Sequence, residues 1–228
     1  MFVPLHDDTP LRVIRFQYMT AALIIANVVL FITTDVFESD ATFAMIAAGY
    51  GLVPAELTSG ALLPGYHPVP EPLTLITYMF LHAGWLHLIS NMLFLWVFAD
   101  NVEDAFGPWG FLVFYLICGI AGALTHTILQ PSSHAPLIGA SAAVSGVLGS
   151  YVVLFPKARV WVLLLMRIPL RISALWVLLG WFVFQIINLF LAGPGDTDVA
   201  WWAHIGGFLV GVTLTYLLRS RLLVTPAR

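Results

Sequence analysis

The sequence predicts an all-α, polytopic membrane protein whose single membrane domain, residues 1–228, is a bundle of six transmembrane helices. Hydrophobic residues make up 60% of the 228 residues and charged residues only 9%, unlike the composition of a soluble domain. Six apolar runs approach the roughly 20 residues needed to cross a bilayer core. The lysines and arginines gather in only three places relative to these runs.

The predicted spans follow one another at approximately residues 16–34, 83–99, 110–130, 137–155, 173–192 and 200–218. The connection from 35 to 82 is expected to be an extracytoplasmic loop with short interfacial elements. Two further apolar stretches, 41–55 and 160–170, are too short to span, and Arg167 and Pro169 interrupt the second. We expect both to be interfacial or re-entrant pieces.

The basic residues predict the orientation. They precede the first span, lie between the fourth and fifth, or follow the sixth: Arg12, Arg15, Lys157, Arg159, Arg167, Arg171, Arg219, Arg221 and Arg228. With six spans these places share one side, and positive charge favours the cytoplasm. We therefore expect a cytoplasmic N-terminal segment at 1–15 and a cytoplasmic tail at 219–228. No cleavable signal peptide is expected, because the first apolar run is too long for one.

Composition also bears on partners. The net charge is −3 and the nine basic residues form no single patch, so no nucleic-acid partner is expected. Cys118 is the single cysteine, which excludes a disulfide within the chain. The lipid bilayer is the partner that the composition implies, and the oligomeric state is left open.

Four polar side chains are predicted to lie at a similar depth near the outer surface. His87 and Asn91 lie about one and two turns into the second span and share a face. Ser141, in LIGASAAVSG (137–146), and His204 each lie about one turn into their spans. A single polar residue at such a place is more often structural, but four at one level favour a functional site.

Small residues in the fourth and sixth spans predict close helix packing. Ser141, Ser145 and Gly149 recur every four residues in the fourth span, as do Gly207 and Gly211 in the sixth. The predicted packing residues are Gly139, Ser145, Gly149, Gly207 and Gly211. Close packing is what a Ser141 hydroxyl needs if an imidazole on another helix is to accept its proton at about 2.6 to 3.2 Å. Such stripes are common in helical membrane proteins, so alone they indicate only packing.

The other polar side chains within the predicted spans do not form a group at one depth. His126 lies near the outer end of the third span without a polar neighbour predicted at its level. Asn27, Gln185 and Asn188 are expected to make packing contacts or interhelical hydrogen bonds.

Three stretches resemble the rhomboid intramembrane serine proteases: FLHAGWLHLISNMLFLWVFADNVEDAFG from residue 80, GASAAVSGVLGSYVVLFP from 139 and AHIGGFLVG from 203. They are similar to the family's second span with its following turn, its nucleophile helix and its histidine helix. The resemblance covers nearly all of the chain from about residue 72. It implies a six-transmembrane-helix, rhomboid-like bundle.

By this resemblance Ser141 is the nucleophile and His204 its general base, while His87 and Asn91 donate hydrogen bonds to the oxyanion. His82 matches a recurrent family histidine, taken as structural. Glu103 and Asp104 match the turn that leads into the third span, where they would favour the helix dipole. One departure is Ala142, where the family usually has glycine, so that the motif here is GASA.

The resemblance implies a serine endopeptidase that cleaves single-span membrane proteins near their extracytoplasmic end, without a metal or other cofactor. The alternative is a catalytically inactive rhomboid-like protein that binds membrane clients, although such members commonly lack the serine or histidine. A transporter is disfavoured, because no carboxylate is predicted at mid-membrane. A prokaryotic plasma membrane is the expected location.

Overall fold

Helices form most of the molecule in the computed structural model, which describes residues 2–36, 39–60, 62, 65–164, 167–193 and 199–223. A helix lies at each predicted span: α1 (Tyr18–Phe31), α5 (Trp85–Phe106), α6 (Pro108–Leu129), α7 (Ser141–Leu154), α8 (Ala174–Leu191) and α9 (Trp201–Leu218). A short π-helical turn, Ile32–Val36, extends α1. Residues 194–198, which form most of the predicted link between the fifth and sixth spans at 193–199, and the tail beyond residue 223, with Arg228, lie outside the described residues.

Length and composition separate these helices into two groups. Among the described residues α6, α8 and α9 are long and apolar enough to cross a membrane, and α5 is a fourth if it is joined to the bent segment Glu71–Phe80 before it. The apolar helices Tyr18–Thr34 and α7 are shorter. Large apolar side chains nevertheless cover the outside, with Phe190 81% and Trp109 75% exposed. The chain is a multi-pass helical membrane protein, and the count of six spans stays a prediction.

A small antiparallel sheet corrects the all-α expectation. Its strands are β1 (Phe2–Asp7), β2 (Arg159–Leu164) and β3 (Ile168–Ser173), in the order β1-β2-β3. The stretch 160–170, expected to be interfacial or re-entrant, thus forms most of two strands, with residues 165 and 166 outside the described part. Val160 and Val162 are buried at every second position, the period of a strand. Pro169 lies on an edge strand, which is where proline is tolerated in a sheet.

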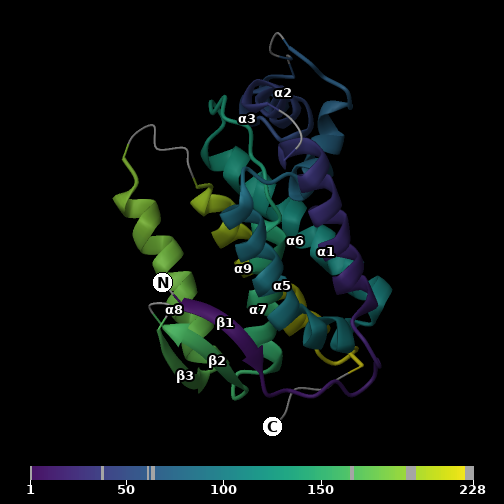
Figure 1. Cartoon of the computed structure of the whole chain (residues 1–228), viewed down its shortest axis with the longest axis vertical. Helices are drawn as coiled ribbons and strands as arrows, with labels where there is room; N and C mark the ends of the chain where they lie inside the picture. The colour runs from purple at the N-terminus through teal and green to yellow at the C-terminus, as the bar shows by residue number, and fades with distance from the viewer. Residues whose placement is uncertain are drawn as a thin grey trace.

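The predicted loop from 35 to 82 contains short helices. They are α2 (Asp40–Tyr50), α3 (Pro54–Ser59), the 3₁₀ turns Glu71–Leu73 and Tyr78–Phe80, and α4 (Thr74–Thr77). Ser39 caps α2 by accepting a hydrogen bond from the Thr42 N–H at 3.2 Å. In Figure 1, α2 and α3 lie at one end of the molecule and the sheet lies at the other.

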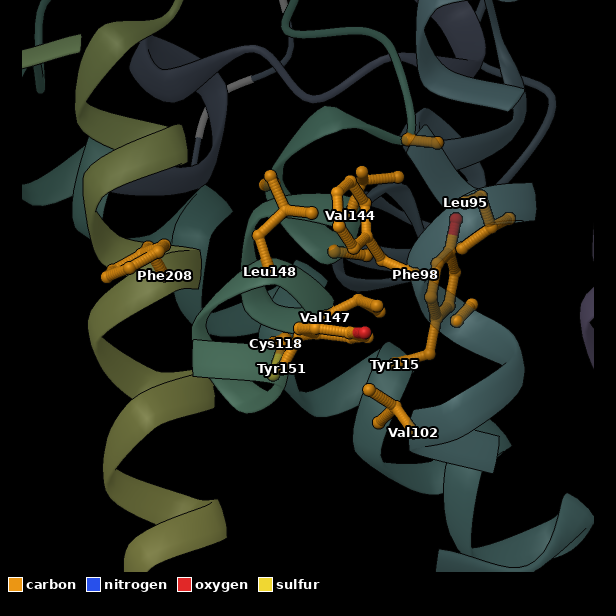
Figure 2. Close-up of a cluster of buried hydrophobic side chains, with 14 of the residues drawn as sticks. Leu95, Phe98, Val102, Tyr115, Cys118, Val144, Val147, Leu148, Tyr151 and Phe208 are labelled. Carbon is orange, nitrogen blue, oxygen red and sulfur yellow. The ribbon is translucent and has the colours of Figure 1, made fainter. Parts of the chain in front are cut away.

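The core is centred on α7. Every residue of this helix from Ala142 to Tyr151 is buried, as expected of a helix that is apolar all round. Figure 2 shows side chains of α5, α6 and α9 gathered around it, among them Phe98, Cys118 and Phe208. Because neighbours surround α7, any residue at its N-terminus is held in a fixed position relative to them.

The acidic turn at the end of α5 makes different contacts from those expected. The helix continues to Phe106, so Glu103 and Asp104 lie in its last turns and not at the start of α6. The Asp104 carboxylate accepts hydrogen bonds from the N–H groups of residues 12, 13 and 14 at 2.7 to 2.8 Å. Glu103 accepts from the N–H groups of Met19 and Thr20 at 3.0 and 2.8 Å. These carboxylates therefore satisfy donors at the start of α1 and fix the N-terminal segment.

Candidate active site

Ser141 and His204 are in contact. Ser141 is the first residue of α7, and His204 lies in the first turn of α9. The His204 Nε2 atom lies 2.8 Å from the Ser141 Oγ atom, although 63 positions separate the residues. Neutral imidazole at this distance can accept the hydroxyl proton, which is the arrangement of a general base beside a nucleophile.

Glycines bring α7 and α9 close enough for this contact. A Cβ atom on Gly207 would collide with the carbonyl oxygen of Ala142, and one on Gly211 with that of Gly146. From the other side, a Cβ on Gly149 would collide with the carbonyl oxygen of Phe208. Three predicted packing glycines therefore lie at the α7–α9 contact, where a methyl group would push the two backbones apart.

Gly139 holds the turn before the nucleophile. Its φ of 111° lies in a region that L side chains rarely adopt. A Cβ atom there would also lie 2.5 Å from the Nε2 atom of His87. The Gly139 N–H donates to the carbonyl oxygen of Tyr78 at 2.8 Å. Glycine at this position therefore lets the His87 ring approach the turn that presents Ser141.

His87 and Asn91 line a cavity of about 650 Å³ together with Ser141 and His204. The Asn91 Nδ2 atom donates to the carbonyl oxygen of His87 at 3.1 Å, which leaves its second N–H for another acceptor. His87 Nδ1 accepts from the Ala83 N–H at 3.4 Å, so a neutral His87 carries its proton on Nε2. Ser141 begins a helix, and its own N–H has no partner within that helix. All four predicted site residues thus share one cavity.

A second cavity of about 570 Å³ adjoins the first. The two share His87, Ile138 and Trp201 among their lining residues. His126, for which no polar neighbour was predicted, lines this second cavity together with Gln130 and Ser133. The second cavity thus extends a partly polar space from the first toward the loop that precedes α7.

Three residues near the site, Ser145, Ala142 and His82, do not line the cavity that holds Ser141 and His204. Ser145 Oγ donates to the carbonyl oxygen of Ser141 at 2.6 Å, a bond within its own helix. The Ala142 side chain is buried and faces Gly122 of α6, and it lines neither cavity. The departure from glycine in GASA therefore adds a methyl group behind the site. The buried His82 ring packs edge-on against the His87 ring, with centroids 4.9 Å apart.

Gln185 is a contact of the site that the sequence predicted only as a packing residue or a partner in an interhelical hydrogen bond, and it makes such a bond. Its Oε1 atom lies 2.9 Å from the Nδ1 atom of His204. The rings of Trp181 and Trp201 lie 6.2 and 6.1 Å from the His204 ring. The signal available in the sequence was a polar residue in the fifth span, about two turns from its outer end. The site predicted from the sequence lay on the second, fourth and sixth spans only, so it did not include Gln185.

Comparison with known proteins identifies the family. A family model described as "Rhomboid domain" matches residues 70–221. The chain is 32% identical over 164 residues to Rhomboid-like protein 11, chloroplastic, of Arabidopsis thaliana, covering 67% of this chain and 55% of that protein. It is 32% identical over 139 residues to Rhomboid-like protease 3 of Toxoplasma gondii, covering 61% and 49%. The chain thus spans about half the length of these relatives.

The relatives differ in activity and in location. Inactive rhomboid protein 1 of Drosophila melanogaster is 39% identical over 80 residues, which cover 35% of this chain and 6% of that protein. One of the relatives is described as chloroplastic, so the comparisons do not support the prokaryotic plasma membrane over an organelle. The resemblance of the three sequence stretches is confirmed, because the matching family model includes all of them. The chain belongs to the rhomboid family.

Proposed function

We propose that the chain is an intramembrane serine endopeptidase that uses Ser141 as nucleophile and His204 as general base. The observation that carries the proposal is the 2.8 Å distance between Ser141 Oγ and His204 Nε2 at a cavity. Oγ attacks the substrate carbonyl carbon while Nε2 takes the proton and later returns it to the leaving amine. Water then hydrolyses the acyl-enzyme, which releases the carboxylic product and restores the Ser141 hydroxyl.

The oxyanion that forms in this reaction needs donors already in place. His87 Nε2–H, the free N–H of Asn91 and the backbone N–H of Ser141 are the candidates, because the three residues line the same cavity. Each such donor is worth roughly 10²- to 10³-fold in rate when it is oriented before the reaction. No step of this mechanism calls for a metal or other cofactor.

The proposed substrates are single-span membrane proteins cleaved near their extracytoplasmic end. A peptide bond within a helix is hydrogen-bonded and shielded, so the substrate must unwind locally before Ser141 can reach it. Residues that weaken a helix, such as glycine and proline, are therefore expected near the cleaved bond.

The proposed topology places both termini in the cytoplasm and the loop at 35–82 outside. Two contacts support the placement of both termini on the same side. The Leu223 N–H donates to the carbonyl oxygen of Ala105 at 2.8 Å. At the other end of the chain, β1 pairs with β2, which follows α7. Figure 1 shows the sheet at the end of the molecule opposite α2 and α3. The prokaryotic plasma membrane stays a prediction from the sequence.

An inactive, client-binding protein is the second candidate, favoured by the likeness to a relative whose name says inactive. Two measurements decide between the candidates. A fluorophosphonate should label the purified protein at Ser141 and leave Ser141→Ala unlabelled. The wild type should cleave a single-span substrate in detergent, and His204→Ala should not. Equal labelling of Ser141→Ala, or cleavage that survives both substitutions, would refute the proposal.

A further inference from the structure

The proton on His204 must sit on a particular nitrogen if this residue is to act as a base. A neutral imidazole carries one N–H, and Nε2 accepts from Ser141 only when the proton is on Nδ1. We propose that Gln185 is a positioning residue that holds His204 in this form, by accepting the Nδ1–H at its side-chain oxygen. The inference rests on the proposed function and adds a third residue to its serine and histidine.

The contacts of His204 place one partner on each ring nitrogen. Nε2 lies 2.8 Å from Ser141 Oγ, and Nδ1 lies 2.9 Å from Gln185 Oε1. The amide oxygen can only accept a hydrogen bond, so Nδ1 must donate, and the lone pair of Nε2 is left facing the hydroxyl. Both distances are within the normal range of a hydrogen bond.

Within the described part of the chain, no side chain other than that of Gln185 makes a hydrogen bond to the Nδ1 atom of His204. Among the described residues that line the two cavities there is no aspartate or glutamate. The neighbouring rings of Trp181 and Trp201 carry an indole N–H, which is a donor and cannot accept from Nδ1. An amide also orients the ring without bringing an unpaired negative charge into a buried site, where a charge is costly.

The position of Gln185 on α8 supports a specific role. It is 3% exposed, whereas the other buried residues of α8 are Ala174, Val177 and Leu178 in its first two turns. Every other residue of α8 from 179 to 191 is partly or fully exposed. The outer part of α8 therefore turns a single buried side chain toward the bundle, and that side chain meets His204.

Matched variants show whether Gln185 positions His204 or only helps α8 to pack against the bundle. Gln185→Met keeps the side-chain length and removes the acceptor oxygen, while Gln185→Glu keeps an acceptor oxygen. The control is Asn188→Met, which removes an amide on the same helix whose Nδ2 bonds only to the carbonyl oxygen of Phe184 at 2.7 Å among the contacts described. Thermal unfolding in detergent checks that all three variants are folded.

The first readout is the rate of labelling by a fluorophosphonate, together with kcat and KM for a single-span substrate. Gln185→Met should lower the labelling rate and kcat about tenfold with KM unchanged. Gln185→Glu should stay within about threefold of wild type, and Asn188→Met should equal it. The inference is overturned if Gln185→Met reacts like wild type, if Gln185→Glu falls as far as Gln185→Met, or if the loss is in KM alone.

The second readout needs no activity, so it separates this inference from the proposed function. The ¹⁵N shifts of labelled histidine distinguish Nδ1–H from Nε2–H, and the His204 signals are assigned by their loss in His204→Ala. We expect the Nδ1–H tautomer to predominate in the wild type and no longer to predominate in Gln185→Met. An unchanged tautomer would overturn the inference. Absence of labelling in the wild type would instead overturn the proposed function, whatever the tautomer.

Discussion

The Cα atom of Gly207 lies so close to the carbonyl oxygen of Ala142 that a methyl group cannot fit between them. Ala142 directly follows Ser141 on α7, and Gly207 lies three residues after His204 on α9. A close approach of the two helices therefore lies within one turn of the proposed catalytic pair, so the packing of the helices and the hydrogen bond across them depend on each other.

Gly207→Ala should therefore damage both stability and activity. Overpacking of this kind costs about 1 to 3 kcal/mol in free energy of unfolding. A shift of about 1 Å between the reacting groups can lower the rate on the order of 10²-fold. Unfolding in mixed detergent micelles and a cleavage assay measure the two effects. Gly180→Ala on α8 is the control, because its Cβ would meet nothing within 4 Å; it should be neutral or stabilising.

Asn91→Ala should lower kcat by roughly 10² to 10³ if Asn91 donates to the oxyanion. Ser90→Ala is a matched control, since the hydroxyl of Ser90 and the amide of Asn91 both donate to the carbonyl oxygen of His87. Loss of a bond to that carbonyl alone should change kcat little. Steady-state cleavage of a model substrate gives the comparison, and equal losses in the two variants would argue against an oxyanion role.

Asp104→Asn should destabilise the protein by about 1 to 3 kcal/mol, because the buried carboxylate accepts three backbone N–H bonds that an amide cannot all accept. The N-terminal segment should also become more accessible to protease. The exposed Asp40 provides the control, and Asp40→Asn should change the free energy of unfolding by less than about 0.5 kcal/mol. A variant as stable as wild type would show that the segment is held by other contacts.

Asp7 in β1 should make stability depend on pH. Burial raises the pKa of Asp7 above its ordinary value, although the hydroxyl of Tyr151 donates a hydrogen bond to its carboxylate. The folded protein then binds this proton more tightly than the unfolded chain. The contribution to the free energy of unfolding is thus fully present below the ordinary carboxyl pKa of about 4 and is lost as the pH rises through the raised pKa.

Asp7→Asn stays neutral and should remove this contribution. Relative to the variant, the wild type should lose thermal stability as the pH rises from about 4. Melting temperatures of both proteins across that range measure the difference, which also cancels the titration of other groups. A difference that does not change with pH would contradict the effect of burial on the pKa of Asp7.

The sequence was informative where a property depends on local hydropathy. Apolar runs of about 20 residues predicted the positions of α6, α8 and α9 to within a few residues, because each run must remain apolar over the thickness of a bilayer. The start of α5 was predicted equally well, but the helix continues to Phe106, beyond the predicted end at residue 99. The sequence was less informative for residues 160–170, where a run of apolar residues fits a strand as well as an interfacial piece. The pairing of β2 with β1 joins segments more than 150 positions apart, and no local pattern records it.

The sequence by itself determined the family and the membrane setting, and it predicted one level for Ser141, His204, His87 and Asn91, because motif order and depth along a helix can be read residue by residue. Only the tertiary structure decided that Gln185 faces His204 and that Asp104 holds the N-terminal segment. Depth along an axis follows from the rise of 1.5 Å per residue, whereas the partner of a side chain depends on how each helix is rotated and tilted against its neighbours.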